Sequence, residues 1–143
     1  MGNRPIAIID SGVGGLSIWQ AISKLLPSED IIYLADQKNF PYGTKNQQAL
    51  LKIMRRNVEF LLKKRVKVVV IACNTATVST LAELRELYAI PIVGTVPVIK
   101  KAVELTKNGR IGVISTLATS KSTYQKNLIA RFASDKKVFE SPQ

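Results

Sequence analysis

The sequence contains no histidine and only one cysteine, Cys73, among its 143 residues. Histidine is the usual general base and the most common metal ligand, so acid–base chemistry here would need a carboxylate, a thiol or a lysine. One cysteine without histidine cannot supply the usual ligands of a metal site, and we therefore predict no metal. A single cysteine also excludes a disulfide bond within the chain.

Long apolar runs and acidic residues are scarce as well. The longest apolar run, 68–73, is far shorter than a membrane span, and residues 1–26 do not resemble a signal peptide. We therefore expect a cytoplasmic protein with no membrane partner. Only 10 acidic residues stand against 21 basic ones, which gives a formal net charge of +11. Such an excess is typical of proteins that bind nucleic acid, anionic surfaces or acidic substrates.

The positions of the basic residues favour a simpler explanation of this charge. Six of them fall in or just after one helical pattern: Arg55, Arg56, Lys63, Lys64, Arg65 and Lys67. This segment lacks the interleaved aromatic residues that stack on bases. We therefore favour a solvated basic helix face over a nucleic-acid patch.

Strand-like and helix-like segments alternate along a chain long enough for one domain with a real core. Strands are expected at 5–10, 30–36, 66–72, 90–94, 109–115 and 136–141, and a loop at 37–45. Helices are expected at 14–26, 46–64, 76–88, 97–106 and 122–133. Continuous apolar strands that alternate with helices predict an α/β fold, in which helices cover both faces of a parallel sheet.

Polar residues gather where four of the expected strands end. In an open parallel sheet, ligands bind beyond the carboxyl ends of the strands. The residues at these ends are Asp10, Ser11 and the glycines of 12–15; Asp36 and the loop 41–45; Cys73, Asn74 and Thr75; and Ser115, Thr116, Thr119 and Ser120. So many hydroxyl, amide and thiol groups predict a pocket for a small anionic molecule, to which helix N-termini add N–H donors.

Each of these motifs has a structural alternative when it is taken alone. The segment "DSGVGG" could be only a strand-to-helix turn, since Ser17 replaces the third glycine of a dinucleotide fingerprint. The segment "PYGT" is a good turn sequence, and Thr116 and Thr119 could simply cap a helix.

Cys73 has the same two interpretations. A lone cysteine is more often a small core residue than a reactive one. Its position favours reactivity, because a helix N-terminus lowers the pKa of a thiol.

Taken together, four segments resemble one known family. The segments "IAIIDSGVGGLSIWQAI", "PYGTK", "VIACNTAT" and "GRIGVISTLATSKSTYQ", in this order and spacing, are similar to the N-terminal half of glutamate racemases in the aspartate/glutamate racemase superfamily. The resemblance implies two similar α/β lobes with the substrate between them. It places residues 1–96 in a first, incomplete lobe and 97–143 at the start of a second. The implied activity is cofactor-independent interconversion of L- and D-glutamate, which supplies D-glutamate for peptidoglycan and so for cell wall biogenesis and cell shape.

The resemblance also implies roles for individual residues. Family members use two cysteines on opposite faces of the substrate, and Cys73 matches the first, with Asp10 proposed to assist it. The positions that match substrate contacts are Asp10, Ser11, Tyr42, Gly43, Asn74, Thr75 and, less directly, Thr116 and Thr119.

The family's second cysteine lies in a C-terminal Cys-Thr-His motif that this sequence does not contain. We therefore expect a fragment or truncated product that cannot perform a two-base racemisation as a single chain. The alternatives are a related aspartate racemase, an inactive half-chain that binds an acidic amino acid or a protein, and a homodimer in which each copy supplies Cys73. DNA gyrase, which some glutamate racemases are reported to bind, is a further candidate partner.

Overall fold

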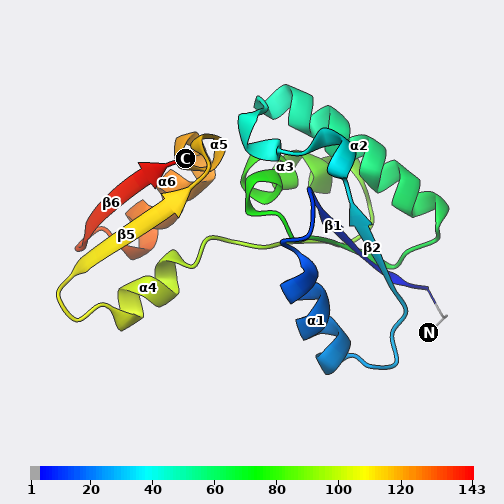
Figure 1. The fold of residues 1–143 in the computed structure, drawn as a ribbon, viewed down its shortest axis with the longest axis horizontal. Helices are drawn as coiled ribbons and strands as arrows, with labels where there is room; N and C mark the ends of the chain where they lie inside the picture. The colour runs from blue at the N-terminus through cyan, green and yellow to red at the C-terminus, as the bar shows by residue number, and fades with distance from the viewer. Residues whose placement is uncertain (1–3) are drawn as a thin grey trace.

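The computed structural model describes residues 4–143, and its strands form two separate sheets (Figure 1). The first sheet has the order β2-β1-β3-β4, and all its pairs are parallel. Its strands are β1 (Ile6–Asp10), β2 (Ile31–Ala35), β3 (Val68–Ile71) and β4 (Ile92–Gly94). The second sheet pairs β5 (Arg110–Ser115) with β6 (Lys137–Pro142), again in parallel. The predicted α/β class with parallel strands is therefore confirmed.

The helices follow the expected order, with one addition. They are α1 (Leu16–Leu25), α2 (Gln47–Lys63), α3 (Asn74–Leu87), α4 (Ile99–Leu105), α5 (Leu117–Lys121) and α6 (Thr123–Phe132). The short helix α5 was not predicted. The expected loop 37–45 contains two 3-10 turns, η1 (Gln37–Asn39) and η2 (Tyr42–Thr44).

Alternating side chains of the first sheet explain its two covered faces. Successive residues of a strand point to opposite faces, so Ala7 and Ile9 pack beneath α2 and α3, whereas Ile6 and Ile8 pack toward α1. Helix α2 buries one stripe of side chains three or four residues apart: Leu50, Met54, Val58 and Leu61. Figure 1 shows α1 on one side of this sheet and α2 and α3 on the other, as predicted.

The second sheet has its own small core and stands beside the first. Ile99 of α4 and Ile111 of β5 are buried there with Ala133, which follows α6. One stretch of chain, 95–98, connects the two sheets, and α5 and α6 lie against α3. The predicted lobe boundary between residues 96 and 97 falls in this stretch and stays a prediction.

The basic residues of α2 point to solvent. Arg55, Arg56, Lys63 and Lys64 are all exposed. Within residues 4–143 the ion pairs are Lys67–Glu29, Lys101–Glu104 and Lys136–Asp135. The outer side of α2 is therefore a solvated basic face, as the favoured interpretation requires. Among the described residues, no helix combines the length and the apolar character that crossing a membrane needs.

Candidate active site

Cys73 lies beyond the carboxyl end of β3, at the position that caps the N-terminus of α3. Strand β1 runs beside β3, and the Ala72 N–H donates to the carbonyl of Ile9 at 2.8 Å. This pairing brings Asp10 and Ser11, at the end of β1, next to the thiol. The Asp10 side chain is buried, and its Oδ2 accepts a hydrogen bond from the Gly12 N–H at 2.9 Å. Three of the predicted site residues thus form one group.

The surroundings of Cys73 raise the pKa of its thiol. Burial is the largest cause, and the negative charge of Asp10 acts in the same direction. Hydrogen bonds from the Ala76 and Thr75 N–H groups and from the Ser11 side chain lower the pKa, but they do not outweigh burial. The prediction that the helix N-terminus lowers this pKa was therefore wrong for the net effect, and the thiol is protonated at neutral pH.

Tyr33 belongs to the same group, although the sequence did not suggest it. Its hydroxyl donates to the Gly12 carbonyl at 3.0 Å, and burial, followed by the charge of Asp10, raises its pKa. The turn also needs a glycine at position 15, because a Cβ there would lie 2.7 Å from the Cβ of Ala72 and 2.9 Å from the Tyr33 hydroxyl. The sequence did not indicate Tyr33 as a site residue, because it lies within β2 and the candidates were sought at the ends of strands.

Asp36, at the end of β2, is bonded within the protein instead of facing a ligand. Its carboxylate accepts hydrogen bonds from the Tyr42 hydroxyl at 2.7 Å, from Asn57 Nδ2 at 3.0 Å and from Asn39 Nδ2 at 2.8 Å. Burial alone would raise the pKa of Asp36, but the bonds from Asn57, Tyr42 and Asn39 bring it below its ordinary value. The Tyr42 side chain is buried, and burial followed by its bond to Asp36 raises its pKa. The Tyr42 side chain is therefore bonded within the protein.

Thr75, Thr116 and Thr119, which we call the threonine cluster, join the two sheets. The Thr75 and Thr116 hydroxyls lie 3.0 Å apart, those of Thr116 and Thr119 lie 3.0 Å apart, and those of Thr75 and Thr119 lie 3.4 Å apart. Thr116 also caps the N-terminus of α5, a helix that was not predicted, by accepting a bond from the Thr119 N–H. Gly43 packs directly against it, since a Cβ at position 43 would lie 2.8 Å from Thr116 Cγ2.

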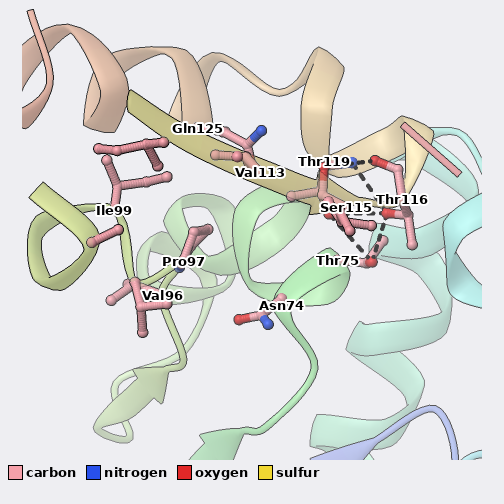
Figure 2. A pocket seen from close by; sticks show the side chains of 15 residues that line it. Asn74, Thr75, Val96, Pro97, Ile99, Val113, Ser115, Thr116, Thr119 and Gln125 are labelled. Carbon is pink, nitrogen blue, oxygen red and sulfur yellow. Dashed lines mark hydrogen bonds between the residues drawn. The ribbon is translucent and has the colours of Figure 1, made fainter. Parts of the chain in front are cut away.

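A groove of about 470 Å³, which we call the β5 groove, runs from the threonine cluster along β5 (Figure 2). Its polar lining includes Asn74, the threonine cluster, Ser115 and Gln125, and its apolar lining includes Val96, Val98, Ile99, Ile111, Val113 and Ile114. Asp10, Ser11 and Cys73 are not part of this lining. Apart from Tyr42 and Gly43, the residues that the family resemblance predicts thus lie in two neighbouring groups, and the consecutive residues 73–75 connect them.

A second groove, of about 520 Å³, lies between the η2 loop and the segment that contains α5. Its lining includes Gly43, Thr44 and Lys45 from the predicted loop 41–45, together with Gln47, Ser79 and Lys121. Within the described part of the chain, no three acidic, cysteine or histidine side chains are arranged to hold a metal ion.

These features define an α/β protein that holds a thiol, a carboxylate and several hydroxyl groups at the carboxyl ends of parallel strands. Residues 6–141 match the family model described as "Asp/Glu/Hydantoin racemase". The chain belongs to this family.

Named relatives give a consistent picture. The chain is 45% identical over 141 residues to a glutamate racemase of Pseudomonas paraeruginosa, and the match covers 98% of this chain and 53% of that protein. A glutamate racemase of Yersinia pseudotuberculosis is 47% identical over 137 residues, covering 94% of this chain and 48% of the relative. The chain therefore spans about half the length of the curated relatives it matches.

Solved structures agree with the sequence comparison. Glutamate racemase from Escherichia coli, in complex with L-glutamate and the activator UDP-MurNAc-Ala, superposes with a TM-score of 0.90 at 39% identity, covering 98% of this chain and 53% of that one. The Francisella tularensis enzyme in complex with D-glutamate has a TM-score of 0.80 at 37% identity, covering 98% of this chain and 53% of that one.

Proposed function

We propose that this chain carries one half of a glutamate racemase active site, in which Cys73 exchanges a proton with Cα of glutamate. The observation that carries the proposal is the position of Cys73, beyond the end of β3 and next to Asp10 and Ser11 from β1. The named relatives are glutamate racemases, and two solved neighbours hold L- or D-glutamate.

The chemistry of Cys73 suits a group that can both return a proton to Cα and remove one. With its raised pKa the thiol is protonated, and it can deliver that proton to a Cα carbanion. The reverse step needs a thiolate, which the positive ammonium group of a bound amino acid would favour. The Ser11 hydroxyl and the N–H groups of Thr75 and Ala76 would stabilise the thiolate by hydrogen bonding.

Substrate binding would use groups on both sides of residues 73–75. Asn74 and the threonine cluster provide an amide and three hydroxyls at the end of the β5 groove, which suits a carboxylate. The N-terminus of α3 adds a favourable dipole for negative charge. Asp10 would receive the substrate's ammonium group. Gly43 would contribute main-chain contacts, whereas Tyr42 is bonded to Asp36 within the protein.

Inversion at Cα needs a second acid–base group on the opposite face of the substrate. We therefore expect this chain alone to bind glutamate and to exchange the Cα proton with solvent, without forming the other enantiomer. The test is to incubate the chain with L-glutamate in D2O and to follow loss of the Cα proton by NMR, together with D-glutamate by chiral chromatography. Cys73→Ala should abolish the exchange and leave binding in place.

Two results would contradict this proposal. Exchange that continues at the same rate in Cys73→Ala would exclude the thiol as the base. Failure of glutamate to shift the resonances of Asn74 or Thr75 would exclude the binding site. Formation of D-glutamate that disappears in Cys73→Ala would instead support a homodimer in which two copies each supply Cys73. A parallel incubation with L-aspartate distinguishes an aspartate racemase.

The wider roles follow only if the racemase activity is established. A supply of D-glutamate for peptidoglycan in the cytoplasm belongs to this proposal, as does the division into lobes at 1–96 and 97–143. A contact with DNA gyrase rests on the family resemblance alone.

A further inference from the structure

Tyr33 reaches the group around Cys73 from the neighbouring strand β2. Its ring packs with Ile8 on the face of the first sheet that α1 covers. Its hydroxyl reaches past the end of β1, where it donates to the Gly12 carbonyl at 3.0 Å. The Gly15 N–H donates to the same hydroxyl oxygen. One phenol therefore ties together both ends of the turn 12–15, which leads from β1 into α1.

The space around Gly15 shows how closely this hydroxyl is packed against the site. A Cβ at position 15 would lie 2.7 Å from the Cβ of Ala72, 2.9 Å from the Tyr33 hydroxyl oxygen and 3.0 Å from the Cβ of Asp10. Ala72 directly precedes Cys73 in the sequence. The Tyr33 hydroxyl, the turn and the ends of β1 and β3 therefore meet at one point beside the residue that carries the thiol.

Gly12 is held on both sides, and this fixes the position of Ser11. The Gly12 N–H donates to Asp10 Oδ2 at 2.9 Å, and the Gly12 carbonyl accepts the bond from Tyr33. Ser11 stands between Asp10 and Gly12, and its hydroxyl donates to the sulfur of Cys73, which lowers the pKa of the thiol. A residue whose neighbours are already bonded loses little further conformational entropy when its side chain forms a hydrogen bond. A loose turn would leave the Ser11 hydroxyl free to turn toward water.

We propose that Tyr33 is a positioning residue for Cys73, which holds the turn 12–15 so that the Ser11 hydroxyl stays hydrogen-bonded to the sulfur. The inference rests on the proposed function, in which Cys73 exchanges a proton with Cα of glutamate. Tyr33 acts through Ser11 and is not itself an acid or a base in this reaction, because its proton is engaged at the Gly12 carbonyl. Without the Tyr33 hydroxyl, the thiolate loses one of its stabilising donors, and less thiolate forms at a given pH.

Three ionisable side chains face the thiol: Asp10 at the end of β1, Tyr33 from β2 and Tyr42 from η2. The negative charge of Cys73 is among the causes that raise the pKa values of Tyr33 and Tyr42, so both phenols ionise after the thiol. Replacing Tyr33 by phenylalanine therefore removes a neutral group, and Asp10 is retained. A change in the titration of Cys73 then reports a change in hydrogen bonding and not the loss of a charge.

The test is the rate at which iodoacetamide alkylates Cys73 near pH 7 in this chain and its variants. Tyr33→Phe should lower the rate at least about threefold, because an increase of about 0.5 in the pKa of the thiol leaves about threefold less thiolate. A merely structural loosening of the turn would act in the opposite direction, since exposure brings the pKa of a buried thiol back toward its ordinary value. Ser11→Ala should lower the rate by a similar factor. Adding Tyr33→Phe to Ser11→Ala should then change the rate less than about 1.5-fold, because Tyr33 acts through Ser11.

Tyr88→Phe is the matched control. It removes the same hydroxyl from a tyrosine that donates to Glu59 at 3.1 Å on the surface, and it should leave the alkylation rate unchanged. Circular dichroism and urea unfolding check that each variant remains folded, which the retained aromatic rings favour.

Three results would overturn the role of Tyr33. These are an alkylation rate that is unchanged or faster in Tyr33→Phe, effects of Tyr33→Phe and Ser11→Ala that simply multiply, and an equal effect of Tyr88→Phe. Exchange of the Cα proton of glutamate in D2O is measured separately in the same variants, and it should slow in parallel with alkylation. Absence of this exchange in the unsubstituted chain would contradict the proposed function. The alkylation rates need no substrate, so they would still decide whether Tyr33 positions Ser11 at the thiol.

Discussion

Replacing Tyr42 by phenylalanine should destabilise the chain through one buried hydrogen bond. The Tyr42 hydroxyl donates to Asp36 at 2.7 Å, and its side chain is only 1% exposed. A hydrogen bond to a charged group contributes about 1.5–3 kcal/mol. The aromatic ring remains, so no cavity forms, and Asn39 and Asn57 continue to donate to the carboxylate. We therefore expect a loss of about 1.5–2 kcal/mol, toward the lower end of that range.

The effect should depend on pH in a defined direction. The pKa of Asp36 is below its ordinary value in the folded chain, so the stability that its charge contributes is present above the ordinary carboxyl pKa of about 4. That contribution is lost as the pH falls through the lowered pKa. Once Asp36 is protonated, the bond from Tyr42 becomes a neutral one, and the cost of Tyr42→Phe should fall to about 0.5–1 kcal/mol.

Urea unfolding of both proteins at pH 7 and at several values below 4 measures this difference. Tyr88→Phe is the control, because the Tyr88 hydroxyl donates to Glu59 at 3.1 Å on the surface and should contribute about 0.5 kcal/mol or less. A Tyr42→Phe cost below about 0.5 kcal/mol at pH 7 would refute the reasoning. So would a cost that stays constant as Asp36 is protonated.

Three further predictions concern the site. Gly43→Ala should destabilise the chain by about 1–3 kcal/mol, because the added Cβ meets Thr116, whereas Gly12→Ala has 3.8 Å of room and should cost less in the same thermal melts. Cys73 should react with iodoacetamide several-fold more slowly than a free thiol near pH 7, and mass spectrometry should show that the rate still rises above pH 9. A rate that reaches its plateau below pH 8 would contradict the raised pKa of Cys73. Thr119→Val should cost about 1 kcal/mol, since its buried hydroxyl bonds within the threonine cluster, and an unchanged urea midpoint would argue against that bond.

Much of the fold could be predicted, because the strands are short apolar runs in the sequence and the helices have apolar residues three or four positions apart. The run 66–72 contains β3, and the pattern 46–64 contains α2 almost to the residue. Helix α5 was not predicted, because five residues are too few to show a helical period. The strand end at Cys73 was predictable from the same patterns, since the apolar run stops where the polar residues begin.

The details of the site depend on contacts between distant segments, which one sequence does not encode locally. The direction of the Tyr42 hydroxyl is set by Asn57, fifteen residues later in α2. The pKa of Cys73 depends on how deeply the thiol is buried beside Asp10, and a motif does not report burial. Family resemblance matched Tyr42 to a substrate contact, but only the structure assigns its side chain to Asp36.

The threonine cluster has a mechanical consequence. When the three hydroxyls separate, each can form hydrogen bonds with water instead, at a small net free energy. Each can act as donor or acceptor, and none is charged, so separation leaves no buried charge without a partner. If apolar side chains packed at the same place instead, the free energy needed to separate them would grow in proportion to the apolar area that they bury. The two sheets are connected by the chain at 95–98, and at the threonine cluster they meet through hydroxyl groups that water can replace at a small net free energy.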